Sequence, residues 1–396
     1  MQKKLLILGG GVSHLAIINI ANNMGLHTVV MDKNPAAKGL KIAKKAINLD
    51  GGNKEQVLSV AKAENIDGIL STGDYSVIPA AYAAEKINLV SLGSKTANLV
   101  TNKGELFSRF AKHGVPIPPR KVVTNFKDAL GVVNKIGLPV ILKPEYSYGA
   151  SRGVIRVNSI EEFEKKFKFT QGFCLKKGII IEKFIDGLEH TIESITINGK
   201  TSVLAISDKI RTSNPYCVAT SLDYPSKQKK DIVRKLKLAA KKAIAASGIR
   251  NGASHIEAIS LSGQVYVIDF GGRGGAGGFI PSVVVPRING VNMMEAMIKI
   301  ALGEKVGSLK PQFWNSVIYR FFVAEPGIVK SINGIRKAQK ISWVVDLKIH
   351  VKKGDRIEVL SNQLLRPGYF VVVGKNNQEA EKRAKLIQEL VKIKTK

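Results

Sequence analysis

Residues 1–100 alternate short apolar runs with stretches of helical periodicity, and this alternation limits the possible fold more than any other feature of the chain. Continuous apolar runs that are joined by helices indicate strands buried on both faces of a parallel sheet. The expected strands are 5–8, 28–31, 46–49 and 68–71, and the expected helices are 14–24 and 54–64. This part of the sequence therefore predicts a parallel α/β domain.

Two polar features follow the predicted strands of this domain. Gly9-Gly10-Gly11 follows the first strand and Asp32 ends the second, which resembles half of a dinucleotide-binding fingerprint. His14 stands where the last glycine would be, so a loop that faces phosphate or substrate, or a simple tight turn, is favoured over NAD binding. Asp74 lies at the carboxyl edge of the sheet, where it either contacts a ligand or caps the next helix.

Beyond residue 100 the pattern changes to hairpins and longer helices, and a break at 114–119 separates a helix at 103–113 from one at 126–136. A long amphipathic helix is expected at 227–247, and the last part combines short strands with a final helix that has Ala380 and Ala384 on one face. We expect an α/β domain at 1–100, a central α+β domain of two subdomains at 101–316, with a lid at about 120–185, and a small C-terminal α+β unit at 317–396.

An acidic hairpin is the strongest chemical signal. Glu257 and Asp269 lie on strand-like runs that flank a two-residue turn at Ser262-Gly263, and the hairpin pairs Glu257 with Ile268 or, one register over, with Asp269. Either register brings two carboxylates to the same end of the hairpin, which suits a hard cation such as Mg²⁺. Arg273 follows four residues later and can hold an anionic group beside that metal. The alternative is an edge hairpin with solvated acids.

Several residues before this hairpin indicate a nucleotide. Lys143 ends a strand before a glycine-containing loop, 147–153, whose amides and hydroxyls suit phosphates. The strand end 182–185 offers backbone groups for an adenine edge and apolar side chains for its ring, and Glu189 suits ribose hydroxyls. Each of these signals has an ordinary structural alternative, such as a solvated or buried strand end, but their order and spacing make a specific set.

Charge and composition argue against a nucleic-acid-binding protein and a membrane protein. The net charge of +30 comes from 61 Lys and Arg against 31 Asp and Glu, and it favours anionic ligands. The lysines are spread along the chain and aromatic residues are only 6%, so no dedicated nucleic-acid surface is expected. No apolar stretch is long enough to span a membrane, and the first run, 5–8, is too short for a signal peptide. Two distant cysteines fit a reducing cytoplasm.

In this order the residues resemble the ATP-grasp superfamily over almost the whole chain, with 1–100 similar to its pre-ATP-grasp domain. The resemblance implies that ATP binds and that Mg²⁺, or alternatively Mn²⁺, is held by Glu257 and Asp269. It gives catalytic roles to Arg273 and Lys143. Lys209, late in the strand after Asn198-Gly199, is expected either to approach the phosphates or to be a surface lysine. The ATP-binding residues that it implies are Lys103, Lys143, Ser147, Gly149, Ser151, Glu182, Lys183, Phe184, Ile185, Glu189 and Lys209. One departure is Gly271, which stands where the family usually has a metal-binding asparagine.

The resemblance implies a carbon–nitrogen ligase that phosphorylates a carboxylate and joins it to an amine, both small molecules of amino-acid type. The turns at 326–327, 353–355 and 366–369 are similar to the end of L-amino-acid ligases. A purine-pathway or carboxylase-type enzyme using formate or bicarbonate, and a non-catalytic nucleotide-binding protein, remain alternatives. His255 is expected to be a structural neighbour of the metal strand or an assistant in proton transfer. A homodimer through the first domain is one assembly that the resemblance suggests.

Overall fold

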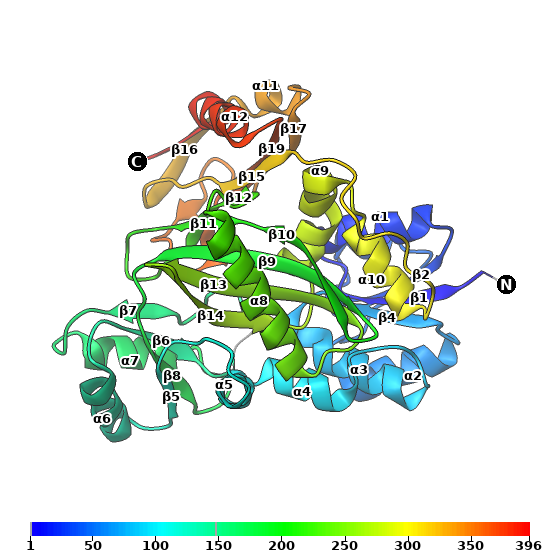
Figure 1. The fold of residues 1–396 in the computed structure, drawn as a ribbon. Helices are drawn as coiled ribbons and strands as arrows, with labels where there is room; N and C mark the ends of the chain where they lie inside the picture. Colours follow the sequence, from blue (N-terminus) through cyan, green and yellow to red (C-terminus); the bar gives the residue numbers. More distant parts are fainter. Residues whose placement is uncertain (1, 147–148) are drawn as a thin grey trace.

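The computed structural model describes residues 2–146 and 149–396 and begins with a parallel sheet (Figure 1). Its strand order is β3-β2-β1-β4, and all the pairings are parallel. The strands are β1 Lys4–Leu8, β2 His27–Met31, β3 Lys45–Ile47 and β4 Gly68–Ser71. The accompanying helices are α1 Leu15–Asn23, α2 Lys54–Ala63, α3 Val77–Lys86 and α4 Ser94–Thr101, with short 3₁₀ turns at Val12–His14, Lys38–Lys41 and Asp74–Ser76. The predicted α/β domain is confirmed.

A second, antiparallel sheet of four strands follows the helix α5, Lys103–Lys112. Its order is β5-β8-β6-β7, and the strands are Arg120–Val123, Ile179–Lys183, Val140–Pro144 and Ile155–Val157. Two helices, α6 Phe126–Ile136 and α7 Phe163–Gln171, pack their apolar faces on this sheet through Phe126, Phe163 and Phe167. This unit occupies the region that the sequence predicts to be the lid.

The largest sheet has nine strands in the order β14-β13-β9-β11-β12-β15-β19-β17, and β10 pairs with β9. Figure 1 shows the amphipathic helix α8, Lys230–Ser247, lying across its β13–β14 part. The apolar residues of α8, including Leu236 and Ala240, pack there against Ile256 and Val267. The strands before the last part of the chain are β9 Leu188–Ile197, β10 Lys200–Ile206, β11 Asp208–Arg211, β12 Ala219–Tyr224, β13 Gly252–Leu261 and β14 Gln264–Gly271.

The C-terminal part continues this sheet because β15, Ser316–Phe321, pairs with β12, while β19, Gly368–Gly374, and β17, Val344–Ile349, extend it. A small sheet of β18 Arg356–Ile357, β16 Gly327–Asn333 and β20 Lys392–Thr395 lies beside helices α11 Ile335–Gln339 and α12 Asn377–Leu390. Ala380 and Ala384 are buried, as predicted. The expectation that the chain ends in a helix is wrong, because alternating residues after α12 form β20 against β16.

A shared core joins the first sheet to the largest one. Leu5 and Ile7 of β1 pack in one cluster with Met294 of α10, Met293–Ala301, and Tyr319 of β15. The chain between β14 and α10 forms a 3₁₀ turn, Ala276–Gly278, a π-helical turn, Ile280–Val284, and α9, Val285–Asn289. This packing brings the carboxyl edge of the parallel sheet close to the end of the acidic hairpin. No helix among the described residues is long and apolar enough to cross a membrane.

Candidate active site

Glu257 and Asp269 face each other across the β13–β14 hairpin, as one of the two predicted registers requires. The turn would pair Glu257 with Ile268, but Ala258 pairs with Val267 and Glu257 with Asp269, so Ile268 is the extra residue of a β-bulge. The bulge moves Asp269 directly opposite Glu257, and directly opposed side chains project from the same face of a sheet. The two carboxylates therefore lie on the same face of the hairpin, in an arrangement that suits a cation.

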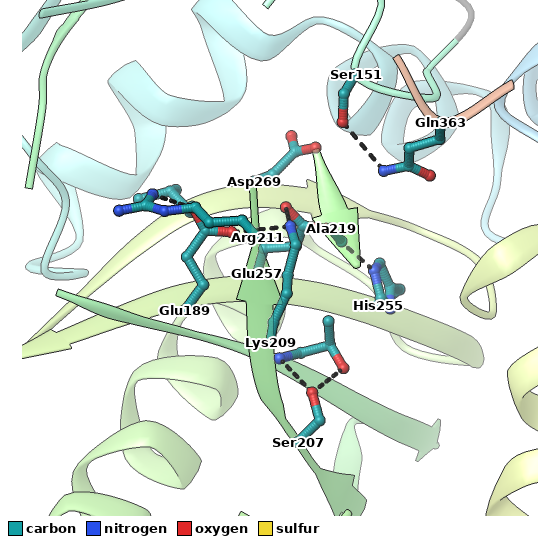
Figure 2. A network of polar contacts seen from close by, with 12 residues as sticks. Ser151, Glu189, Ser207, Lys209, Arg211, Ala219, His255, Glu257, Asp269 and Gln363 are labelled. Atoms are coloured by element: carbon teal, nitrogen blue, oxygen red, sulfur yellow. Dashed lines mark hydrogen bonds and ion pairs between the residues drawn. The ribbon is translucent and has the colours of Figure 1, made fainter. Parts of the chain in front are cut away.

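Lys209 lies between two of the predicted acidic residues (Figure 2). Its Nζ is 2.9 Å from Glu189 Oε2 and 2.8 Å from Glu257 Oε2, and its side chain is 5% exposed. Burial opposes the charge of the ammonium, but Glu189 and Glu257 outweigh it and raise the pKa of Lys209. Burial likewise opposes ionisation of Glu257, and Lys209 and His255 nevertheless lower its pKa. Arg211 also donates to Glu189, at 2.6 Å, so the predicted ribose acid already has two cationic partners.

A buried ionic cluster connects the lid sheet to the hairpin. Lys143 Nζ donates at 2.9 Å both to Glu182 Oε1 and to the carbonyl of Ile268, the bulged residue. Arg120 pairs with the other oxygen of Glu182 and lies 3.5 Å from the centre of the Phe107 ring. Burial and the nearby Arg120 lower the pKa of Lys143 well below its usual value. The carboxylate of Glu182 is thus already paired with Lys143 and Arg120. Its side chain is therefore not part of the adenine contact predicted for 182–185, which concerns the backbone of this strand end.

The other residues of the strand end predicted to bind adenine form some of their hydrogen bonds within the protein. The amides of Lys183 and Phe184 donate to the carbonyls of Pro119 and Pro139, at 2.8 and 3.1 Å. Lys183 Nζ bonds to carbonyl oxygens of the preceding loop, Gly137 and Leu138, at 3.1 Å each, so its side chain points away from the acidic hairpin. In the described part of the chain the amide of Ile185 has no backbone or side-chain acceptor. This amide and the buried Phe184 ring are the features that suit a nucleobase.

Two further cations reach the hairpin end from distant elements. Lys103, the first residue of α5, contacts Asp269 Oδ1, and the Arg273 guanidinium donates to both oxygens of Asp74 at 2.6 Å. Burial would raise the pKa of Asp74, but Arg273 holds it below its usual value. Asp74 therefore neither caps a helix through its side chain nor stands alone, because it orients the predicted catalytic arginine.

His255, two residues before Glu257, contacts the fully buried Glu193 through Nδ1, and its Nε2 is 3.8 Å from Glu257 Oε1. Burial favours the neutral imidazole, but Glu193 outweighs it and raises the pKa of His255 to about 9. Glu193 also accepts a hydrogen bond from the amide of Gly275 at 3.2 Å. This geometry favours the structural interpretation of His255 over proton acceptance, since the imidazole is already protonated at neutral pH.

The predicted phosphate loop is described from residue 149 onward, and Ser147 lies outside the described residues. A Cβ added to Gly149 would lie 2.9 Å from Asp74 Oδ2, which shows how closely this loop approaches the Asp74–Arg273 pair. Ser151 Oγ accepts a hydrogen bond from Gln363 Nε2 at 3.0 Å (Figure 2). The loop thus lies between the first sheet and the C-terminal part.

Five residues with evident roles at this site escaped the sequence interpretation: Arg120, Glu193, Arg211, Gln363 and, as the partner of Arg273, Asp74. All of them act through contacts between elements that are far apart in the chain, and no spacing pattern marks such contacts. A charged residue within a strand is the signal that could have found Arg120 in β5 and Glu193 in β9, but no strand is predicted at 120–123 from the sequence.

The acidic pair limits which metal ion this site can hold. In the parts of the chain that are described, no group of three or more His, Cys, Asp or Glu residues is arranged to hold an ion. Two opposed carboxylates with Gly271 nearby suit Mg²⁺, which keeps several waters and usually takes only one or two protein carboxylates together with phosphate oxygens. They do not suit a structural Zn²⁺ site, which needs four ligands.

Two family models match the chain. An ATP-grasp domain matches residues 136–282, and the model described as L-amino acid ligase C-terminal domain 2 matches residues 320–396. The alanine–anticapsin ligase of Bacillus subtilis is 24% identical over 387 residues, covering 86% of this chain and 80% of that protein. The carbamoyl phosphate synthase large chain of Clostridium perfringens is 23% identical over 358 residues, and the match spans only 32% of its length.

Among solved structures, an L-amino acid ligase from Bacillus licheniformis superposes with a TM-score of 0.85 at 23% identity, covering 100% of this chain and 99% of that one. This likeness concerns the fold, from the first parallel sheet to the small C-terminal sheet. The family models and the site geometry agree on the same central domain. The chain therefore carries an ATP-grasp domain followed by an L-amino acid ligase C-terminal domain, and it is similar over most of its length to an alanine–anticapsin ligase.

Proposed function

We propose that this chain is an ADP-forming ligase that joins the carboxylate of one amino-acid-like molecule to the amine of another. A carboxylate oxygen of the first substrate attacks the γ-phosphorus of ATP, and the bond to ADP breaks. The amine then attacks the carbonyl carbon of the acyl phosphate, so that a C–N bond forms while the C–O bond to phosphate breaks. The products are an amide or peptide, ADP and phosphate, and the amine loses a proton.

The nucleotide would lie between the lid sheet and the central sheet. The Ile185 amide and the Phe184 ring suit the adenine, and Glu189, which is paired with Arg211 and Lys209, suits the ribose. Lys143 and segment 149–153 would contact the phosphates. Transfer of a phosphoryl group needs positioning and charge neutralisation more than a covalent catalyst, and no nucleophilic Ser or Cys is required.

Glu257 and Asp269 would hold Mg²⁺, which when bound neutralises the charge that develops on the phosphate oxygens. Glu257 is paired with Lys209, and Asp269 with Lys103. Both lysines would have to move away from the carboxylates for a metal ion to bind between them. Each released ammonium then has phosphate oxygens within its reach, so the net charge stays compensated. Mn²⁺ is the alternative cation because it prefers the same oxygen ligands.

Arg273 would bind the transferred phosphate and the acyl oxygen. Asp74 fixes the guanidinium through two bonds of 2.6 Å, and Nη1 donates to the carbonyl of Gly274 at 3.1 Å, so an anion would meet the remaining N–H groups of Nη1 and Nη2. Such a preorganised donor stabilises charge without reorganising during the reaction. Lys103 and Lys143 would complete the positive surroundings of the phosphoryl group.

The observation that carries this proposal is the opposed Glu257–Asp269 pair, surrounded by Lys103, Lys209 and Arg273, in a chain with an L-amino acid ligase C-terminal domain. The same C-terminal match favours an organic acid over the formate or bicarbonate of the alternative interpretation.

The test is a screen of phosphate release with Mg²⁺ and ATP, offering amino acids singly and in pairs, together with formate and bicarbonate. We expect release that requires one acid and one amine. Release with formate or bicarbonate alone would replace the proposal by the alternative, and binding of ATP without any release would favour the binding protein.

The metal assignment has a separate test. Glu257→Gln should lower ADP formation by about 100-fold or more, the usual scale for losing a group that stabilises transition-state charge. Glu295→Gln, on the helix α10 and ion-paired only with Lys299, is the matched control that should keep full activity. Equal activities of the two variants would remove Glu257 from the site.

A further inference from the structure

Segment 149–153 adopts a backbone conformation that its own sequence does not favour. Ala150 and Ser151 are consecutive non-glycine residues with left-handed φ angles, 60° and 56°. Such angles place the Cβ of an L-residue close to the backbone and are uncommon outside glycine and asparagine. A conformation of this kind persists only when surrounding contacts impose it.

Two of those contacts are local, because the amide of Arg152 donates to the carbonyl of Gly149 at 3.4 Å and the amide of Val154 to that of Ser151 at 3.3 Å. Two others come from one residue far along the chain. Gln363, in the 3₁₀ turn Gln363–Leu365, donates its backbone amide to the carbonyl of Ala150 at 3.0 Å and its Nε2 to Ser151 Oγ at 3.0 Å. Both left-handed residues are therefore held by the same partner, 212 positions away from Ser151. Figure 2 shows this contact, and a Cβ added to the neighbouring Gly149 would lie 2.9 Å from Asp74 Oδ2, which places the held segment close to the Asp74–Arg273 pair.

The turn that carries Gln363 is itself fixed to the central sheet. Arg366 donates to the carbonyl of Ala219 at 2.7 Å and lies 3.6 Å from the centre of the Phe321 ring. The side chain of Asn362 caps the turn by accepting from the amide of Leu364 at 3.0 Å. The contact between Gln363 and segment 149–153 thus connects this segment to β12 and β15.

We infer that Gln363 is a positioning residue for ATP, because it holds segment 149–153 in the conformation that meets the phosphates. This inference deepens the proposed function and relies on its placement of the phosphates beside this segment. The inference gives the C-terminal domain a role in phosphorylation of the carboxylate substrate. The reason is that Gln363, which holds the nucleotide-binding segment, lies outside the ATP-grasp match at 136–282. Gln363 itself need not touch the nucleotide.

The first arm of the experiment does not depend on catalysis. Hydrogen exchange of the peptide that contains 149–158 is compared in the wild type, Gln363→Ala and Leu364→Ala without nucleotide. Leu364 is the matched control because it lies in the same turn and is 69% exposed. We expect exchange to rise about fivefold in Gln363→Ala only, the effect of losing one hydrogen bond. Unchanged exchange, or an equal rise in the control, would overturn the inference.

The second arm measures ATP use in the same variants. Gln363→Ala should raise KM for ATP about fivefold with a smaller change in kcat. Gln363→Glu should restore KM, because the Ser151 hydroxyl can donate to a carboxylate. In the Ser151→Ala background, the Gln363→Ala change should have little further effect.

The two proposals fail in different ways. Faster exchange with unchanged KM would overturn the positioning role while leaving the ligase reaction intact. If the wild type forms no product in the substrate screen, the proposed ligase function fails, and titration with a fluorescent ATP analogue replaces KM. Equal affinity of the wild type and Gln363→Ala for that analogue would then overturn the inference independently.

Discussion

Asp74, in the 3₁₀ turn after β4, and Arg273, just after β14, form a two-point ion pair, with both Nε–Oδ1 and Nη2–Oδ2 at 2.6 Å and 199 positions between them in the chain. The pair joins the carboxyl edge of one sheet to the end of the acidic hairpin of another. Ligands of open α/β sheets bind at this edge, so the ion pair sets where the two parts meet around a substrate.

Asp74→Asn should destabilise the protein by about 1 to 3 kcal/mol at neutral pH, the usual scale for a hydrogen bond to a charged group. Because Arg273 holds the pKa of Asp74 below its usual 3.8, the stabilisation is present above that value and is lost as the pH falls through the lower folded-state pKa. Urea unfolding at pH 7, 4 and 3 measures it. If the difference in free energy of unfolding between Asp74→Asn and the wild type stayed constant down to pH 3, this ion pair would contribute no pH dependence to stability.

His255 gives the opposite pH dependence. Glu193 raises the pKa of His255 from 6.5 to about 9. The contribution of His255 to the free energy of unfolding is therefore complete below pH 6.5 and is lost as the pH rises through about 9. His255→Gln should therefore be less stable than the wild type at pH 6, with the difference shrinking above pH 9. The exposed His113 provides the control variant, His113→Gln, which should show no such trend. A difference that persisted undiminished at pH 10 would contradict the protonated state of His255.

Lys143→Met should combine a loss of ATP use with a loss of stability. Lys143 shares the buried Glu182 with Arg120, and removing one partner of a buried ion pair costs about 3 to 5 kcal/mol. Thermal unfolding without nucleotide measures the stability, and KM for ATP is measured well below the unfolding temperature. Lys183→Met, which affects only bonds to loop carbonyls, is the comparison and should leave KM for ATP near the wild-type value. An unchanged KM in Lys143→Met would take this lysine out of the phosphate site.

Gly271→Asn should strengthen metal binding. Residue 271 lies two positions after Asp269 on β14, so its side chain would project from the same face. A Cβ there would be 3.4 Å from Arg273 Cζ, which is ordinary contact and leaves room for an amide. The Mg²⁺ concentration for half-maximal ADP formation should fall by about tenfold, in the range of ligand effects on metal affinity. Gly271→Ala separates the amide from the added carbon, and an equal shift in both variants would argue against metal ligation.

The acidic hairpin illustrates how far local patterns reach. The two-residue turn and the alternating strands predict the hairpin, and they place Glu257 and Asp269 at one end of it within a single register step. At the bulge that decides between the registers, the carbonyl of Ile268 accepts a hydrogen bond from the ammonium of Lys143 in the lid sheet. That contact joins elements 125 positions apart, so no local pattern contains it.

Glu182 shows the opposite case, in which the position was predicted and the role of the side chain was not. Its place at the end of a buried strand is correct, but its carboxylate serves Lys143 and Arg120 inside the protein. A buried charge needs a partner, and which partner it finds depends on how the lid strands β5, β8 and β6 are ordered in the sheet. Strand order is a long-range property that periodicity does not encode.

By itself the sequence determined the local elements and the chemical character of the site: the parallel α/β start, the helices α5 and α6, and the paired carboxylates with their nearby lysines and arginine. These follow from periodicity, turn residues and charge, which act over a few residues. The tertiary structure alone decided the contacts Asp74–Arg273, Lys143–Ile268 and Gln363–Ser151. Each of them joins distant segments, and it forms because packing of the whole chain brings buried polar groups to the partners that satisfy them.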